Sequence, residues 1–175
     1  MSNNNSDLTV TNCTFTGNSA PSGNSLAFNS RAQRGRSAVG LIDCIIWDNG
    51  KVIWNNDRSS IVISYSNVRG GWPGEGNIDA DPFFAELGYW ADADDPNVVV
   101  ESNDPNAVWI DGDYHLKSQA GRWSPNSQTW VLDDVTSPCI DVGDPMSAVG
   151  LEPLPNGDRI NMGAYGGTSE ASKSP

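Results

Sequence analysis

The sequence lacks any run of about 18 apolar residues, the length that a helix needs to cross a membrane, so we expect no membrane insertion. It also lacks a signal peptide, because Met1 is followed by Ser-Asn-Asn-Asn-Ser and then almost at once by a repeat. A start inside a repeat is typical of a piece of a longer protein. We therefore expect the C-terminal part of a precursor that is secreted or held at the cell surface.

Basic residues are scarce. Ten Lys and Arg stand against 22 Asp and Glu, which gives a net charge of −12. No basic stripe is present to neutralise phosphates, so nucleic acid is excluded as a partner. The charge also argues against adhesion to anionic lipid or polyuronate by charge alone. The excess of carboxylates fits solubility, or calcium binding by Asp-rich loops.

Histidine and cysteine are scarce too, with one His and three Cys. His115 has no His or Cys partner at metal-ligand spacing, which predicts a structural role. Cys139 stands alone and predicts a small buried apolar side chain, since only one His exists to activate a nucleophile. The Gly-x-Ser-x-Gly elbow of many serine hydrolases is absent, and we expect no organic cofactor.

Runs of Leu, Ala, Glu and Lys that build long helices are missing, and the apolar fraction is 37%. The chain holds instead 18 Gly, 11 Pro and many Asn, Ser and Asp, which favour turns. Its 175 residues fit one domain, or one domain and a tail. This composition predicts an all-β fold.

Three segments of the N-terminal half are alike: residues 8–18, 40–49 and 60–70. Their equivalent positions are Val10, Leu41 and Ile63, then Cys13, Cys44 and Ser66, then Phe15, Ile46 and Val68. The copies are spaced by 31 and then 22 residues. A period near 22, with β-branched and alternating apolar positions, is typical of one coil of a parallel β-helix.

Stacking follows from such coils, because neighbouring coils lie about 4.8 Å apart and place equivalent residues over one another. Cys13 would lie over Cys44, and Asn18 over Asn49. The spacing permits a disulfide between the two cysteines, although we favour stacked reduced thiols.

The repeat also predicts boundaries. Residues 1–84 are expected to form β-helix coils, with a Ser-, Gly-, Asn- and Arg-rich loop inserted at residues 19–36. Residues 85–166 are expected to form irregular coils and a cap, with short strands near 97–101, 108–110, 114–116 and 129–132. Residues 167–175 are expected to be a disordered tail. The uncapped N-terminal coil leaves a monomer or an end-to-end dimer open.

Further motifs carry a resemblance over nearly the whole chain. They are Asn12-Cys-Thr-Phe15, Cys44-Ile-Ile-Trp-Asp-Asn49, Gly76-Asn-Ile-Asp-Ala-Asp-Pro-Phe83, Gly112-Asp-Tyr-His-Leu116, Ser137-Pro-Cys-Ile-Asp-Val-Gly-Asp144 and Gly157-Asp-Arg-Ile-Asn-Met-Gly-Ala-Tyr165. The string resembles the C-terminal region of right-handed parallel β-helix repeat proteins of bacteria, including those with choice-of-anchor Q domains. The resemblance implies a short right-handed parallel β-helix of about three to five coils with a loop-rich cap. It implies little about function.

One candidate catalytic pair is Asp79 and Asp81. On a strand, side chains two residues apart face the same way at roughly 6.5 to 7 Å. An inverting glycosidase places its two carboxyl groups about 6.5 to 9.5 Å apart, so acid and base could both be supplied. The alternative, which we favour, is that both carboxylates serve turns near Pro82.

The candidate calcium ligands are the Asp-rich stretches after residue 91. Alternating Asp in a loop presents several hard oxygen ligands to calcium, although the EF-hand spacing is absent. Solvated turns are the alternative. The residues are Asp92, Asp94, Asp95, Asp111 and Asp113.

Seven Trp are too many for the interior of a narrow solenoid. Trp47 follows the inward Ile46 and should point outward by alternation, where its ring can stack on a sugar. The alternative is packing of loops against the solenoid wall. The candidate carbohydrate-binding residues are Trp47, Trp54, Trp72 and Trp90.

The leading hypothesis is a module that binds an extracellular polysaccharide through exposed Trp. Two alternatives remain open at this point: a small glycoside hydrolase, cellulase-like or polygalacturonase-like, and a structural stalk or adhesin fragment.

Overall fold

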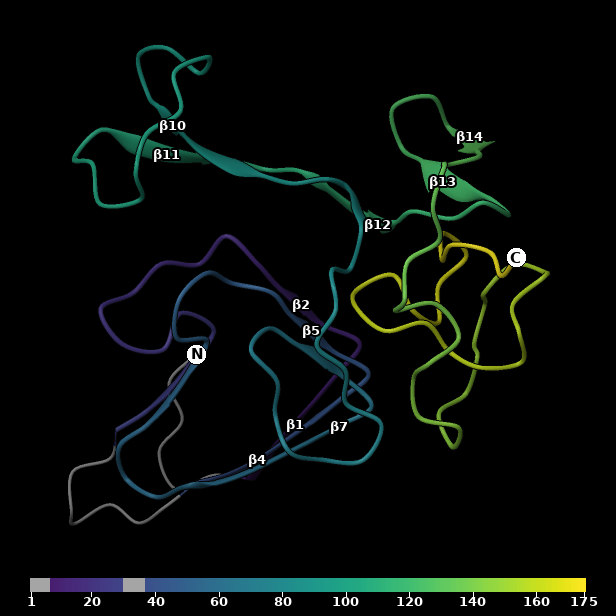
Figure 1. Ribbon diagram of the computed structural model, residues 1–175, viewed down its shortest axis with the longest axis horizontal. Coiled ribbons are helices and arrows are strands. Elements are labelled where there is room, and N and C mark those ends of the chain that lie inside the picture. The colour runs from purple at the N-terminus through teal and green to yellow at the C-terminus, as the bar shows by residue number, and fades with distance from the viewer. Residues whose placement is uncertain (1–6, 30–36) are drawn as a thin grey trace.

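The computed structural model describes residues 7–29 and 37–175, and every regular element in these ranges is a β-strand (Figure 1). No helix of the described residues is long and apolar enough to cross a membrane. The fold is therefore all-β, as the composition predicts. The strands form six small, separate sheets within the described ranges, three parallel and three antiparallel.

The first parallel sheet joins β1 (Asp7–Thr11), β4 (Ala38–Ile42) and β7 (Ser60–Ser64) in that order. Its register pairs Val10 with Leu41 and Leu41 with Ile63, as the repeat predicts. These three side chains are buried and belong to one core cluster. The alternating pattern of each strand therefore turns one face to the core and the other outward.

The second parallel sheet joins β2 (Thr14–Phe15), β5 (Ile45–Ile46) and β8 (Asn67–Val68). Phe15, Ile46 and Val68 are in register, which confirms the second predicted alignment. A residue with a positive φ of 47–57° stands at the same corner of each copy, between the first and second strand: Asn12, Asp43 and Tyr65. The tight corner requires this left-handed backbone.

The third parallel sheet corrects the predicted loop at residues 19–36. β3 (Leu26–Phe28) lies inside that segment and pairs with β6 (Ile53–Asn55). Leu26 and Phe28 are buried in the same core as β4 and β7. Three residues between Ser-, Gly- and Asn-rich flanks are too short to give a strand pattern, and burial of two large apolar side chains stabilises the strand. Residues 30–36 of the predicted loop lie outside the described residues.

After residue 83 the pairing becomes antiparallel. β9 (Phe84–Glu86) pairs with β12 (Asp113–Leu116), β10 (Tyr89–Asp92) with β11 (Ala107–Ile110), and β13 (Arg122–Ser124) with β14 (Thr129–Val131). Three of the four predicted short strands are present. The fourth, near residues 97–101, makes only one bridge, from Val99 to Ala91.

The last 40 residues contain no strand but are held to the rest of the chain. Asp43, buried at the corner after β4, accepts the backbone N–H of Asp144 at 2.5 Å and the hydroxyl of Ser147 at 2.6 Å. Met162 is buried in a second core cluster with Ile45 and Leu116. This cluster joins the C-terminal region to the second parallel sheet.

The predicted disordered tail, residues 167–175, is instead packed on the molecule. Ala171, Ser172 and Ser174 are buried. The backbone N–H of Lys173 donates to the carbonyl of Gly121 at 2.8 Å, and the hydroxyl of Ser118 donates to the carbonyl of Lys173 at 2.6 Å. The polar composition of these residues predicted disorder, because composition alone does not reveal the hydrogen bonds that the rest of the folded chain supplies.

All three cysteines are free thiols, which agrees with the favoured reduced state of Cys13 and Cys44. Each of these two thiols donates to the carbonyl two residues earlier, at 3.2 Å. Burial raises the pKa of the Cys44 thiol to about 12 and that of Cys139 to about 11. Cys139 is therefore a buried apolar side chain, as predicted.

Candidate functional site

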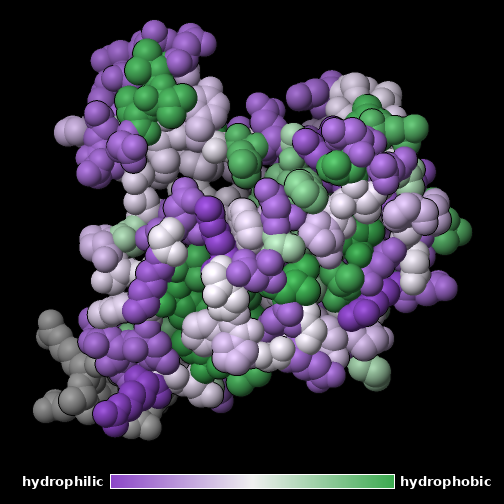
Figure 2. All heavy atoms as spheres, viewed as in Figure 1, coloured by the Kyte–Doolittle hydropathy of each residue, from purple (hydrophilic) through white to green (hydrophobic). Residues whose placement is uncertain are grey.

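The β10–β11 hairpin and its loops, residues 87–112, form an arm that projects from the β9–β12 pair and extends over the loops that follow β2 and β5 (Figure 1). In the space-filling view the arm stands apart from the body, with a hollow beneath it (Figure 2). That hollow is a groove of about 720 Å³ lined by both the body and the arm. A volume of this size lies within the range of about 300–1,000 Å³ typical of ligand sites.

The floor of the groove is a row of three residues at equivalent positions of successive copies. Thr16, Trp47 and Arg69 each follow the inward Phe15, Ile46 or Val68 and line the groove. Backbone bonds fix the row: the N–H of Trp47 donates to the carbonyl of Phe15 at 2.8 Å. The outward direction predicted for Trp47 by strand alternation is therefore confirmed.

Arg69 lies over the Trp47 ring, with its guanidinium carbon 5.4 Å from the ring centroid. Its Nη1 donates to Oδ1 of Asn49 at 2.6 Å. Among the described residues, which include every Asp and Glu of the chain, Arg69 has no carboxylate partner within ion-pair distance. The cation is thus oriented by an aromatic face and an amide, and its charge remains available in the groove.

The arm supplies an aromatic wall. Trp90 of β10 and Trp109 of β11 are cross-strand partners, with ring centroids 5.3 Å apart in an edge-to-face arrangement. Nε1 of Trp109 donates to Oδ1 of Asp111 at 2.9 Å, which fixes the indole. Both rings are only partly buried and line the groove.

Two contacts close the arm onto the body. Trp109 packs against Gly17 so tightly that a Cβ at position 17 would overlap the indole, and Gly17 has a φ of 73° that favours glycine. Near the arm's loops, the hydroxyls of Ser19 and Ser102 lie 2.8 Å apart. A second hollow of about 550 Å³ is also lined by Gly17 and Trp109 and reaches Tyr114 and Tyr165.

Of the four predicted carbohydrate-binding residues, Trp47 and Trp90 line the groove. Trp54 lies in β6, where it pairs with Ala27, and Trp72 packs on the N-terminal core. Trp109 and Arg69 were missed as site residues. The signal for Arg69 was available, because it occupies the same repeat position as Trp47.

The predicted catalytic carboxylates lie in a segment without strand structure, so the expected strand geometry is not formed. Oδ1 of Asp79 accepts the N–H of Gly70 at 3.1 Å, and Oδ1 of Asp81 accepts that of Phe83 at 2.8 Å. Both side chains are exposed. Asp81 lines the groove and Asp79 does not, so only one of the pair reaches the candidate site.

The predicted calcium ligands fall in three places. Asp92, Asp94 and Asp95 share the arm's loops, where Oδ1 of Asp92 accepts the N–H of Asp94 at 2.8 Å and Oδ1 of Asp95 accepts that of Asn97 at 3.0 Å. Asp111 is beside Trp109, and Asp113 is in a different cluster. No group of three or more His, Cys, Asp or Glu able to hold a metal ion occurs in the described part of the chain. A calcium site therefore stays a prediction.

Asp113 belongs to a charged cluster around the buried His115. Oδ1 of Asp113 lies 2.5 Å from Nδ1 of His115, and its Oδ2 accepts from Arg122 at 3.1 Å. Burial raises the pKa of Asp113, but the His115 bonds and the Arg122 charge outweigh it and leave the pKa below its ordinary value. The His115 ring stacks on Tyr165 at 3.6 Å, and Nε2 lies 3.4 Å from Glu170 without hydrogen-bond geometry. The predicted structural role of His115 fits this arrangement.

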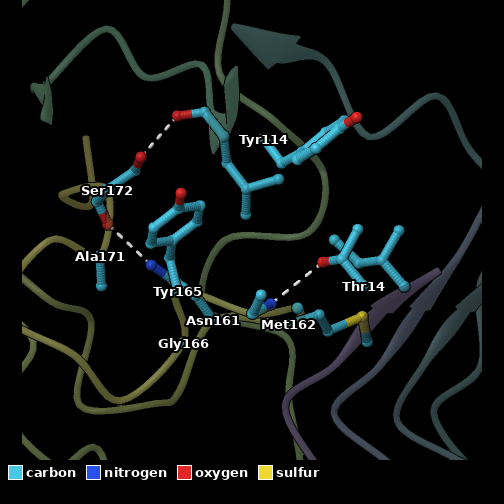
Figure 3. A pocket seen from close by; sticks show the side chains of 12 residues that line it. Thr14, Tyr114, Asn161, Met162, Tyr165, Gly166, Ala171 and Ser172 are labelled. Carbon is cyan, nitrogen blue, oxygen red and sulfur yellow. Dashed lines mark hydrogen bonds between the residues drawn. The ribbon is translucent and has the colours of Figure 1, made fainter. Parts of the chain in front are cut away.

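A small hollow beside this cluster, of about 10 Å³, is where the C-terminal segment packs on β2 (Figure 3). The N–H of Ala164 donates to the hydroxyl of Thr14 at 3.0 Å, and Nδ2 of Asn161 donates to the carbonyl of Ser172 at 2.8 Å. The space holds one water at most, so it is a packing joint rather than a ligand site.

Comparison with known proteins gives one family. A protein-family model described as disaggregatase related matches residues 24–143, which include β3 to β14 and most of the groove. No curated protein and no solved structure matches the chain.

Proposed function

Because the chain belongs to the disaggregatase-related family, we propose that it is an extracellular β-helix module that binds polysaccharide in the groove beneath the arm. One observation carries the proposal. Trp47, which follows β5, and the Trp90–Trp109 pair of the β10–β11 arm line a single groove, although they lie far apart in the sequence. The family description, disaggregatase related, is compatible with a protein that acts on aggregated material outside the cell.

The same proposal gives the repeats of the N-terminal half the architecture of a short right-handed parallel β-helix. The order of the parallel strands supports this part of the proposal, because β1, β2 and β3 are followed in the same order by β4, β5 and β6, and then by β7 and β8. The residues after 84 act as the cap of its C-terminal end. The same proposal includes a secreted or surface location and loops stiffened by calcium. It leaves open a monomer or an end-to-end dimer through the N-terminal coil.

The chemistry of the groove suits sugars. An indole ring offers a flat apolar face that stacks on the C–H face of a sugar, and its N–H bonds a hydroxyl. Around the aromatic rings stand amide and hydroxyl groups that can donate and accept in turn. They are Asn18, Ser19, Asn24, Asn49 and Ser102.

A second candidate function is glycoside hydrolysis. Asp81 from the body and Glu101 from the arm line the same groove, so two carboxylates face one hollow. A hydrolase needs one of them desolvated as the acid, whereas both side chains are exposed to solvent. Binding without cleavage is therefore the function we favour.

The test is incubation with a panel of soluble and insoluble polysaccharides, with and without calcium, scoring pull-down and released reducing ends together. We expect binding without release, and a loss of about tenfold or more in affinity for Trp47→Ala and Trp90→Ala. Trp123→Ala is the matched control, because Trp123 lies in β13 and outside the groove. Release that disappears in Asp81→Asn or Glu101→Gln would make the protein a hydrolase instead. If both Trp47→Ala and Trp90→Ala still bind polysaccharide normally, the groove is not the binding site.

A further inference from the structure

The two hollows beneath the arm share much of their lining. Thr16, Gly17, Asn18 and Ser19 of the body line both, as do Trp90 and Trp109 of the arm. The contact between Trp109 and Gly17 lies in this shared part. Because Trp109 and Gly17 are in contact, this point separates the two hollows and forms one end of the larger groove.

The larger groove runs across the repeats rather than along a strand. Its floor is the row of Thr16, Trp47 and Arg69, one residue from each of three hydrogen-bonded neighbours. Neighbouring strands are about 4.8 Å apart, so the row presents equivalent outward positions at regular steps. A linear polymer lying along the row would meet one such position after another.

The main aromatic side chain of the floor is covered rather than open. Trp47 is only partly exposed, with Arg69 on its ring and the arm residues Trp90 and Trp109 across the groove. A flat crystalline face of packed chains touches only side chains that stand clear of the surface. The arm would therefore prevent a crystalline polymer face from reaching the Trp47 ring.

We infer that the ligand class of this groove is a single dispersed polysaccharide chain, bound beneath the arm along the row of equivalent positions, and not the surface of a crystalline polymer. This inference rests on the proposed polysaccharide binding and narrows it. Trp109 is the specificity-determining residue, because its ring lines the groove and its contact with Gly17 holds the arm over the row.

The test compares physical forms of one polymer. The probes are cellulose and chitin, each microcrystalline and acid-swollen, together with the soluble linear chains pectate, alginate and hydroxyethyl cellulose. We expect binding to the swollen or soluble form of at least one polymer, about tenfold above binding to its crystalline form. Oligosaccharides of that polymer should compete, with affinity that rises with length until the groove is filled.

Trp109→Ala separates this inference from the proposal on which it rests. The variant should lose the preference for swollen or soluble chains, while Trp123→Ala keeps it. Equal or stronger binding to the crystalline form, without competition by oligosaccharides, would overturn the single-chain inference and leave polysaccharide binding intact. Absence of binding to every probe would overturn both. Circular dichroism of each variant checks that the fold is retained.

Discussion

The molecule contains two antiparallel hairpins with the same central feature and different surroundings. In the β10–β11 arm Trp90 pairs with Trp109, and in the β13–β14 hairpin Trp123 pairs with Trp130. Ring centroids are 5.3 and 5.6 Å apart, with interplanar angles of 65° and 64°. Cross-strand aromatic pairs of this kind stabilise a two-stranded ribbon by about 0.2–1 kcal/mol.

The difference lies in what each pair faces. Lys173 of the C-terminal segment places its ammonium 4.4 Å from the centroid of Trp130, so one ring of this pair is covered by the chain itself. The pair in the arm lines the groove, and its contact with the body is that of Trp109 with the small Gly17. The same local pairing therefore stabilises a packed hairpin in one place and leaves aromatic faces open to a ligand in the other.

The largest expected effect separates the hairpins by function. Trp109→Ala should lower affinity for the bound polysaccharide about tenfold or more, because the groove loses its wall. Trp130→Ala should leave affinity unchanged and lower stability by roughly 2 kcal/mol, since a partly buried indole is lost. Affinity electrophoresis and thermal melts measure the two effects. Equal losses of affinity in both variants would show that the hairpins do not differ as described.

The next effect depends on pH. Glu152 is 7% exposed, and its Oε1 accepts the N–H groups of Asn161 and Gly167 at 2.8 Å, which holds the C-terminal segment over Trp130. Burial, helped by the charge of Asp141, raises the pKa of Glu152 above its ordinary value of 4.5. A raised folded pKa gives stability that is complete below the unfolded pKa and is lost as pH rises through the folded one.

Hydrogen exchange measured segment by segment should therefore show residues 161–174 opening more as pH rises above about 4.5, with residues 89–110 unaffected. Exchange rates must first be corrected for their own pH dependence. Glu152→Gln should remove this dependence, because the amide keeps the acceptor oxygen without a charge. An unchanged pH response in that variant would show that another group controls the segment.

Asp113 should act with the opposite sign. Its lowered pKa gives stability that is present above the ordinary value of 3.8 and is lost as pH falls through the lower, folded value. Asp113→Asn should therefore destabilise the protein at pH 7 by about 1–3 kcal/mol, because a partly buried carboxylate that bonds His115 and Arg122 loses its charge. Thermal melts of the variant and the parent across this pH range measure the difference, which should shrink in acid.

A smaller effect is expected from Lys173→Ala. Removal of the cation over Trp130 should cost about 0.5–1 kcal/mol, a fall in melting temperature of roughly 1–4 °C. Lys117→Ala, a partly exposed Lys with no ring contact among the described residues, is the control. Equal shifts in both variants would mean that the ring contact contributes nothing measurable.

The smallest effect concerns the arm's second contact. Ser102→Ala removes the hydroxyl pair with Ser19 and should change stability by less than about 1 kcal/mol. It should nevertheless speed hydrogen exchange of the arm, since this pair and the Gly17 contact hold the arm to the body. If hydrogen exchange of the arm is unchanged in Ser102→Ala, the contact of Trp109 with Gly17 is the main contact that holds the arm to the body.

The sequence predicts the repeat-dependent features best. The alignment of Val10, Leu41 and Ile63, and the outward direction of Trp47, follow from positions that recur at fixed places in each copy. The regular spacing of β-strands turns such recurrence into geometry. Stacking alone therefore suffices to predict these positions.

Features set by contacts between distant segments were not predictable in the same way. β3 is too short to show a pattern, and the packing of residues 167–175 depends on carbonyls of Leu116, Gly121 and Pro155. The groove depends on Trp109 meeting Gly17, which no local pattern of either hairpin or repeat encodes. Site residues carried by the arm were therefore the hardest to find.

The corner residue Asp43 has a consequence for the order in which the chain folds. Its carboxylate bonds groups 101 and 104 residues further along, at Asp144 and Ser147. Closing so long a segment costs conformational entropy before any bond forms, and contacts of high sequence separation slow folding. We expect the repeats to form first and the C-terminal region to dock last. Removal of the C-terminal region would then leave the repeats able to form, but Asp43 without either partner.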